Sequence, residues 1–114
     1  MNIDCADAEV MAVFYCRLLG WQVASRDHDF VLLENPTGGA TLSFQQEAWY
    51  QPPVWPERPG ELTKMIHLDL KVDDLAGAVA HVIAIGGRLA DHQPRPDLRV
   101  MLDPAGHPFC LYTD

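Results

Sequence analysis

Residues 14–21 (FYCRLLGW) and residues 79–87 (VAHVIAIGG) decide the fold, because each is an apolar helical pattern that ends at glycine. The first glycines of the two patterns, Gly20 and Gly86, lie 66 positions apart. Downstream, the turn signals NPTGG and DPAGH begin 68 positions apart, and each precedes a short strand pattern. A nearly constant offset indicates two copies of one unit, each close to half of the chain.

The first copy predicts a short strand at the very start of the chain, followed by a helix with Asp7 as its N-cap. The core-facing stripe of this helix is predicted to be Val10, Phe14 and Leu18, and Gly20 ends it. Three strands are then predicted at 21–26, 29–34 and 40–46.

The second copy repeats this order. A strand at 67–72 precedes a helix whose N-cap is Asp73 or Asp74 and which ends at Gly86. The predicted core stripe of this helix is Leu75, Val79, Val82 and Ile83. Strands are expected at 87–91, 97–102 and 108–113. Each copy is therefore a β-α-β-β-β module, and the fold class is α+β.

Residues 47–63 connect the two modules and hold four prolines, which exclude a helix or a central strand. We therefore expect a single domain over 1–114, with module one at 1–46, a linker at 47–63 and module two at 64–114. The linker also carries Trp49, Tyr50 and Trp55. These aromatics either cover a pocket or dock on the outside or at a dimer contact.

The charge balance narrows the classes of partner. Eight Lys and Arg against 16 Asp and Glu give a formal net charge of -8, which repels phosphate backbones and anionic lipids. We therefore expect no nucleic-acid and no membrane partner. Three cysteines without metal-site spacing, and no apolar run of about 20 residues, predict a cytoplasmic protein without disulfides.

Strand alternation sorts side chains onto two faces. Leu68, Leu70 and Val72 are expected to face the helices, as are Leu42, Phe44, Phe109 and Leu111. The opposite face then carries polar or soft groups: His67, Asp69, Lys71, Thr41, Ser43, Gln45, Cys110 and Tyr112. This face is either a ligand cleft or the ordinary wet face of an antiparallel sheet.

The segments 67–75 (HLDLKVDDL) and 102–111 (LDPAGHPFCL), with the opening residues 4–7 (DCAD), resemble the vicinal oxygen chelate superfamily. This superfamily includes glyoxalase I, extradiol dioxygenases and bleomycin-resistance proteins, and the resemblance covers almost the whole chain. More specifically, the chain resembles small glyoxalase-like proteins. It implies that the two βαβββ modules form a curved mixed sheet around a cavity, with the helices on the outer face.

In metal-dependent members of that superfamily, a divalent ion binds four side chains from the first and last strands of both modules. Carried over, His67 fits the first-strand ligand of module two, and the counterpart 66 positions earlier is Met1. The last-strand carboxylates fall on Ser43 and Cys110. One clear ligand is too few for a hard ion, so we expect no cofactor, and a divalent metal is the alternative.

Three functions stay open on the sequence. The first is a metal-free protein that binds a neutral or cationic small molecule, with Trp21 and Phe30 adding stacking surface to a ligand set of Ser43, Gln45, Trp49, Tyr50, Trp55 and Cys110. The second is a metal-dependent lyase, isomerase or dioxygenase with His67 as general base, assisted by Asp69 or Cys110. The third is an interaction domain. A homodimer is expected, and paired modules within one chain or swapped between chains are both compatible with the sequence.

Overall fold

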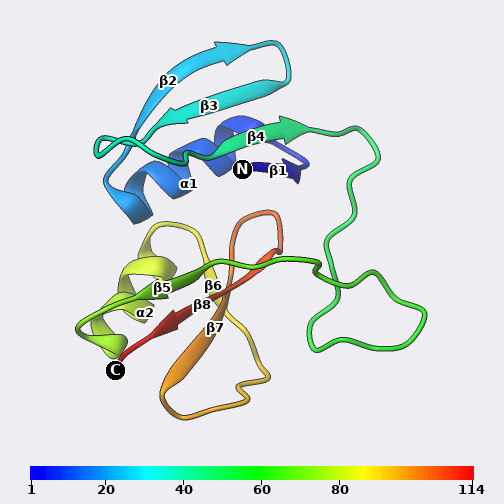
Figure 1. Cartoon of the computed structure of the whole chain (residues 1–114). Helices are drawn as coiled ribbons and strands as arrows, with labels where there is room; N and C mark the ends of the chain where they lie inside the picture. The colour runs from blue at the N-terminus through cyan, green and yellow to red at the C-terminus, as the bar shows by residue number, and fades with distance from the viewer. The chain divides into compact units, whose positions relative to one another are not determined.

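The computed structural model describes all residues 1–114, which form two compact units, Met1–Gln51 and Pro52–Asp114 (Figure 1). The first unit contains β1 (Asn2–Cys5), α1 (Ala8–Leu19), β2 (Gln22–Asp27), β3 (Phe30–Glu34) and β4 (Ser43–Gln46). The second contains β5 (Asp69–Lys71), α2 (Leu75–Ala84), β6 (Arg88–Leu89), β7 (Leu98–Leu102) and β8 (Pro108–Tyr112). The predicted β-α-β-β-β order is thus confirmed in both halves.

Each unit has one four-stranded mixed sheet, and the two sheets share one topology. The strand order is β1-β4-β3-β2 in the first and β5-β8-β7-β6 in the second. In each sheet the first strand pairs in parallel with the last, and the remaining pairs are antiparallel. A parallel pair needs a crossover, and the helix that follows the first strand begins this connection. The first and last strands of each module therefore lie side by side.

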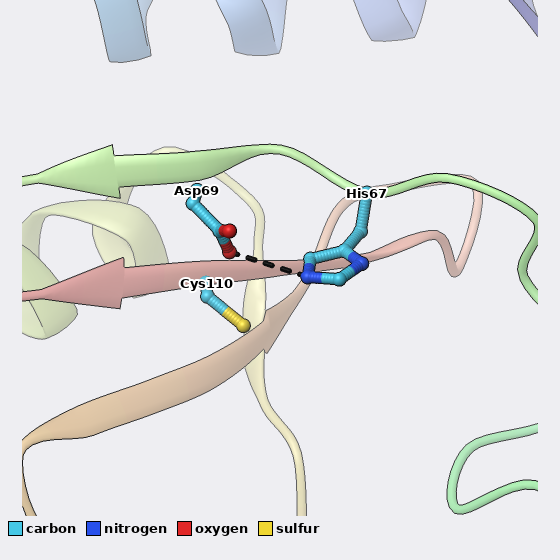
Figure 2. Close-up of side chains that lie close together, drawn as sticks. All are labelled: His67, Asp69 and Cys110. Carbon is cyan, nitrogen blue, oxygen red and sulfur yellow. Dashed lines mark ion pairs between the residues drawn. The ribbon is translucent and has the colours of Figure 1, made fainter.

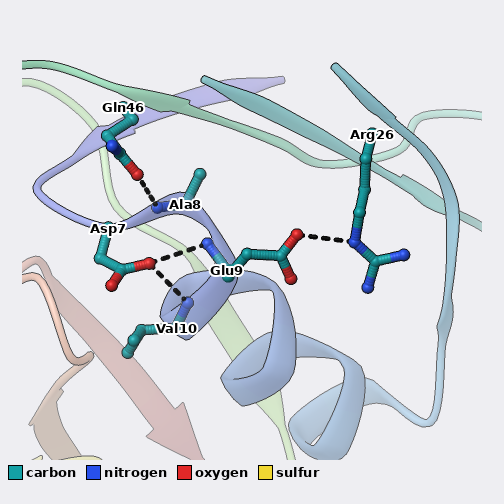
Figure 3. A network of polar contacts seen from close by, with 6 residues as sticks. All are labelled: Asp7, Ala8, Glu9, Val10, Arg26 and Gln46. Carbon is teal, nitrogen blue, oxygen red and sulfur yellow. Dashed lines mark hydrogen bonds and ion pairs between the residues drawn. The ribbon is translucent and has the colours of Figure 1, made fainter. Parts of the chain in front are cut away.

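Helix α1 begins at a well-made N-cap. Asp7 has extended backbone, and its Oδ1 accepts from the N–H groups of Glu9 and Val10, both at 3.1 Å (Figure 3). A third N–H of the first turn, from Ala8, donates to Gln46 Oε1 at the end of β4. At the other end Gly20 adopts φ 72°, the left-handed conformation expected from the sequence.

Helix α2 uses Asp74 as its N-cap, which resolves the choice between Asp73 and Asp74. Asp74 Oδ1 accepts from a single N–H, that of Gly77. A Cβ at Gly77 would lie only 2.5 Å from Asp74 Oδ2, so glycine leaves the space that the capping carboxylate fills. At the C-terminal end Gly86 has φ 107°, as its place after the helical pattern predicts.

The core of the first unit lies between α1 and its sheet. Ala8, Met11, Ala12 and Tyr15 are buried at i, i+3, i+4 and i+7, and Tyr15 stacks on Phe44 of β4 with ring centroids 5.3 Å apart. The prediction that Val10 faces the core is wrong, since it is 48% exposed. Phe14 of the predicted stripe is buried as expected, with 1% exposed, and Leu18 is partly exposed. The buried face is therefore shifted from the predicted one toward Met11 and Tyr15.

The second unit is built in the same way, with a smaller helix face. Val82 of α2 is fully buried, as are Val100 and Met101 of β7 and Phe109 and Leu111 of β8. Ile83 was predicted in the core stripe and is 52% exposed, so that assignment is wrong. Apolar residues lie on every side of this ten-residue helix and leave the buried face ambiguous in the sequence; in the structure Val82 is the one that is fully buried.

The segment between the modules is divided between the two units. Residues 47–51 end the first, whereas Pro52 onward belongs to the second. Pro52 lies against the 103–106 turn, where a Cβ on Gly106 would approach its Cβ to 2.9 Å. Neither helix of the chain is long and apolar enough to cross a membrane.

Candidate functional site

The parallel pair β5 and β8 brings the chemically interesting residues of module two together. Its register places Asp69 opposite Cys110, and the Cys110 N–H donates to the Leu68 carbonyl at 2.8 Å. Phe109 and Leu111 on either side of Cys110 are buried in the core. Cys110 therefore points to the opposite face, as strand alternation predicts.

His67, Asp69 and Cys110 form one cluster on that face (Figure 2). His67 Nε2 lies 3.2 Å from Asp69 Oδ1, and one candidate ligand atom from each of the three residues lies within 4.8 Å of the others. The side chains of His67 and Asp69 remain open to solvent, whereas Cys110 is half-buried. The arrangement offers an acceptor, a titratable imidazole and a soft sulfur to an incoming ligand.

The Cys110 side chain is a protonated thiol at neutral pH. Burial raises the pKa of the thiol, and the Asp69 carboxylate raises it further by its charge and by a hydrogen bond, while the Lys64 ammonium lowers it. A thiolate is the nucleophilic form of cysteine, so this environment opposes nucleophilic catalysis by Cys110. The thiol is better suited to donate to Asp69 and to line a site.

The corresponding place in module one carries different chemistry. There the register places Asn2 opposite Ser43, and the Ser43 hydroxyl donates to Asn2 Oδ1 at 3.0 Å. The Ser43 N–H donates to the Met1 carbonyl at 2.9 Å, just as Cys110 donates to Leu68. Met1 therefore corresponds to Leu68, and the sequence alignment of Met1 with His67 is one residue out of register.

The other predicted ligand-binding residues are spread over both units. In the first, Gln45 is half-buried on β4 with its Nε2 donating to the Gln46 carbonyl, Tyr50 is half-buried, and Trp49 is 94% exposed. In the second, the Trp55 indole N–H donates to the His92 carbonyl at 3.3 Å. Their joint action on one ligand stays a prediction.

Two residues that the sequence did not single out lie beside Trp55. Lys64 Nζ sits over the indole ring, 4.5 Å from its centroid, and is ion-paired with Glu57. No periodicity could indicate this contact, because all three residues lie in the proline-rich loop. The effect of Lys64 on the pKa of Cys110 links this loop to the cluster.

The donors fit the superfamily's metal site only in part. In module one, the Ser43 hydroxyl donates a hydrogen bond to the side-chain amide oxygen of Asn2, and only 8% of Ser43 is exposed. Ser43 thus carries a hydroxyl at the last-strand position, where a hard ion would take a carboxylate. The nitrogen, oxygen and sulfur donors of module two instead match the ligand types of zinc, with three protein ligands and a fourth position left for solvent or substrate.

A pair of βαβββ modules, each with its first and last strands side by side, defines a duplicated α+β protein with its functional candidates on the parallel strand pair. The sequence model of the glyoxalase-like domain family matches residues 1–112. The chain therefore belongs to the glyoxalase-like domain family. No curated protein sequence matches the chain at a significant level.

Solved structures agree on the fold. A glyoxalase/bleomycin resistance protein/dioxygenase family enzyme from Burkholderia phytofirmans PsJN is 20% identical with a TM-score of 0.72, covering 99% of this chain and 94% of that one. A glyoxalase-related enzyme from Fulvimarina pelagi is 19% identical with a TM-score of 0.71, covering 100% and 85%. A bleomycin resistance determinant encoded on transposon Tn5 is 21% identical with a TM-score of 0.59, covering 99% and 93%. At these identities the likeness establishes the fold alone.

Proposed function

We propose that this glyoxalase-like protein binds a small organic molecule at the face formed by His67, Asp69 and Cys110, without a catalytic metal. The gathering of these three side chains on one face of β5 and β8 supports the proposal. His67 and Asp69 are open to solvent, so a ligand can exchange hydrogen bonds with them. The Cys110 thiol supplies a softer, half-buried surface beside them.

The charges around the cluster favour a neutral or cationic ligand. Asp69 carries a carboxylate, Lys64 is already paired with Glu57, and the whole chain has a formal net charge of -8. An anionic ligand would meet like charge both locally and over the surface. In module one the equivalents of Asp69 and Cys110 are Asn2 and Ser43, which are neutral and bonded to each other, so they supply no second charged cluster.

A binding experiment tests this proposal. The full chain, kept in EDTA, is titrated with a panel of small aromatic, neutral and cationic compounds, and the imidazole resonances of His67 are followed by NMR. We expect at least one compound to shift them. Calorimetry with that compound should then show binding weakened about two- to tenfold in Asp69→Asn and in His67→Ala, as loss of one hydrogen bond does. Asp73→Asn and His28→Ala are matched controls, since both residues are exposed and lie outside the cluster.

The same cluster favours one second function, that of a metal-dependent enzyme. The observation behind it is the mutual distance of the three donor atoms, within 4.8 Å. A zinc ion held by His67, Asp69 and Cys110 would act as a Lewis acid on a substrate oxygen. In that case His67 and Asp69 position the ion, and the Cys110 proton is lost on binding.

Metal uptake separates the two functions. The chain is dialysed against zinc, manganese, nickel or ferrous ions, freed of excess metal, and analysed for bound metal. One zinc per chain that is lost in both His67→Ala and Cys110→Ser would replace the metal-free proposal. Retained binding in those variants with loss in His81→Ala or His107→Ala would place the metal elsewhere and count against the metal-dependent function.

A further inference from the structure

The loop between the modules holds a cation against an aromatic ring. Lys64 Nζ lies 4.5 Å from the centroid of the Trp55 ring and is ion-paired with Glu57. The Lys64 side chain is only 17% exposed, which is unusual for a lysine. Ring and carboxylate together thus form a site that accommodates a positive charge and removes most of it from water.

The Trp55 ring is held in place by contacts other than Lys64. The Trp55 indole N–H donates to the His92 carbonyl at 3.3 Å, and the ring contacts the His92 imidazole with centroids 5.8 Å apart. The Val54 N–H donates to the Leu62 carbonyl at 2.8 Å and closes the loop on itself. The indole is therefore positioned by the backbone around it, and Lys64 is not one of the groups that hold it.

We propose that Trp55 and Glu57 form a subsite for an organic ammonium group, and that Lys64 fills it as an internal cation until such a ligand arrives. A ring face and a carboxylate attract any cation, whatever its origin. A primary ammonium is compact and strongly hydrated, whereas a quaternary ammonium loses less hydration when it stacks on an indole. Such a group competes with Lys64 for the same face.

The subsite also lies within electrostatic reach of the His67, Asp69 and Cys110 cluster. The Lys64 ammonium lowers the pKa of the Cys110 thiol, so its charge acts at the cluster. This inference rests on the proposed function and deepens it, because it names the class of ligand and the residues that select it.

The test uses choline and its neutral isostere 3,3-dimethyl-1-butanol as probes of the full chain. The reporter is the indole N–H resonance of Trp55 in a ¹⁵N spectrum, assigned with a Trp55→Phe variant, and Trp21 and Trp49 serve as internal controls. We expect choline to shift the Trp55 signal with millimolar affinity, and Lys64→Ala to bind it at least fivefold more tightly. Lys64→Arg keeps a cation over the ring and should bind choline as weakly as the native chain.

Two further variants identify the partners. In the Lys64→Ala background, Glu57→Gln should weaken choline binding at least threefold, and Trp55→Leu, followed by calorimetry, should abolish it. Equal binding of the neutral isostere, an unchanged affinity in Lys64→Ala, or a response at Trp49 alone would overturn the proposal. Tighter binding of acetate or phosphate by the native chain than by Lys64→Ala would also overturn it, because Lys64 would then be an anion site.

The outcome is distinguishable from that of the proposed function. If choline binds at Trp55 but no compound shifts the His67 resonances, the cation subsite stands and the proposal of ligand binding at the cluster fails. If a ligand shifts the His67 resonances and its affinity is unchanged in Lys64→Ala, ligand binding at the cluster stands and the cation subsite fails. Thermal melting of each variant excludes loss of fold as the cause of lost binding.

Discussion

The two modules share one strand topology and differ at the equivalent point of their parallel strand pairs. In module one, Asn2 and Ser43 face each other and form a neutral hydrogen bond. In module two the same register joins Asp69 to Cys110, and His67 lies 3.2 Å from the carboxylate. The two copies thus share their strand topology but differ in the side chains at this position. One copy has a neutral hydrogen-bonded pair, and the other has a solvent-accessible cluster of polar side chains.

This difference places the candidate function within one module. The superfamily's metal position takes ligands from both copies, whereas here the His67, Asp69 and Cys110 cluster lies in the second copy alone. Ser43 is almost wholly buried and bonded to Asn2, while His67 and Asp69 are open to solvent. Changes in module one should therefore act mainly on stability, and changes in module two should also act on binding.

The largest expected effects come from equivalent core positions of the last strands. Phe44→Ala in module one should destabilise the chain by about 3–5 kcal/mol, and Leu111→Ala in module two by about 2–5 kcal/mol. Phe44 is expected to matter more because it is fully buried and its ring stacks on Tyr15. Urea unfolding followed by circular dichroism measures both.

Val13→Ala is the control for these core variants, since Val13 is an exposed apolar residue on α1. Its expected change is within about 0.5 kcal/mol. A larger loss for Val13→Ala than for Leu111→Ala would show that the exposed side of α1 is covered in solution. A smaller loss of stability for Phe44→Ala than for Leu111→Ala would contradict the prediction that the core position in module one contributes more.

Helix caps should give an intermediate effect, again larger in module one. Asp7→Ala removes the acceptor of two N–H groups and should lower stability by about 1 kcal/mol, within the usual range for N-caps. Asp74→Ala removes the acceptor of one and should lower it by less. Asp73→Ala, one residue before the cap, is the control, and an equal loss there would reassign the cap of α2.

Duplication, helix ends and strand order could be predicted from the sequence because they depend on local signals. Glycine after an apolar run and Asp-Pro or Asn-Pro turns have a few low-energy backbone solutions. Alternation also brought His67, Asp69 and Cys110 to one face. What failed was the choice between neighbouring helical stripes, as at Val10 and Ile83, because several spacings satisfy the same period.

The alignment of Met1 with His67 failed for a different reason. The offset between the copies is 66 at the helix ends and 68 at the turns, whereas the first and last strands share an offset of 67, since Asn2 and Ser43 correspond to Asp69 and Cys110. Backbone hydrogen bonds from Ser43 and Cys110 settle it by matching Met1 with Leu68. The contact of Lys64 with Trp55 was beyond prediction, since it depends on the course of an irregular loop.

The smallest expected effect is a change in thiol reactivity at Cys110. Burial and the Asp69 carboxylate raise the pKa of this thiol, so we expect iodoacetamide in EDTA at pH 8 to label it more slowly than an unfolded cysteine. Asp69→Asn gives module two the amide that module one has at Asn2, lowers the pKa, and should speed labelling about two- to tenfold, where tenfold is one pKa unit. Lys64→Ala removes the charge that lowers the pKa and should slow it.

The sign of the pH dependence follows from the same shift. Because the folded chain holds the Cys110 proton more tightly than the unfolded chain, its contribution to stability is complete below about pH 8.5 and is lost as pH rises through the raised pKa. Cys16 is the internal control, since burial also raises its pKa but its charged neighbour is Arg26. Peptide mapping should show Cys16 labelling unchanged by Asp69→Asn, and an unchanged Cys110 rate would mean that Asp69 does not reach the thiol.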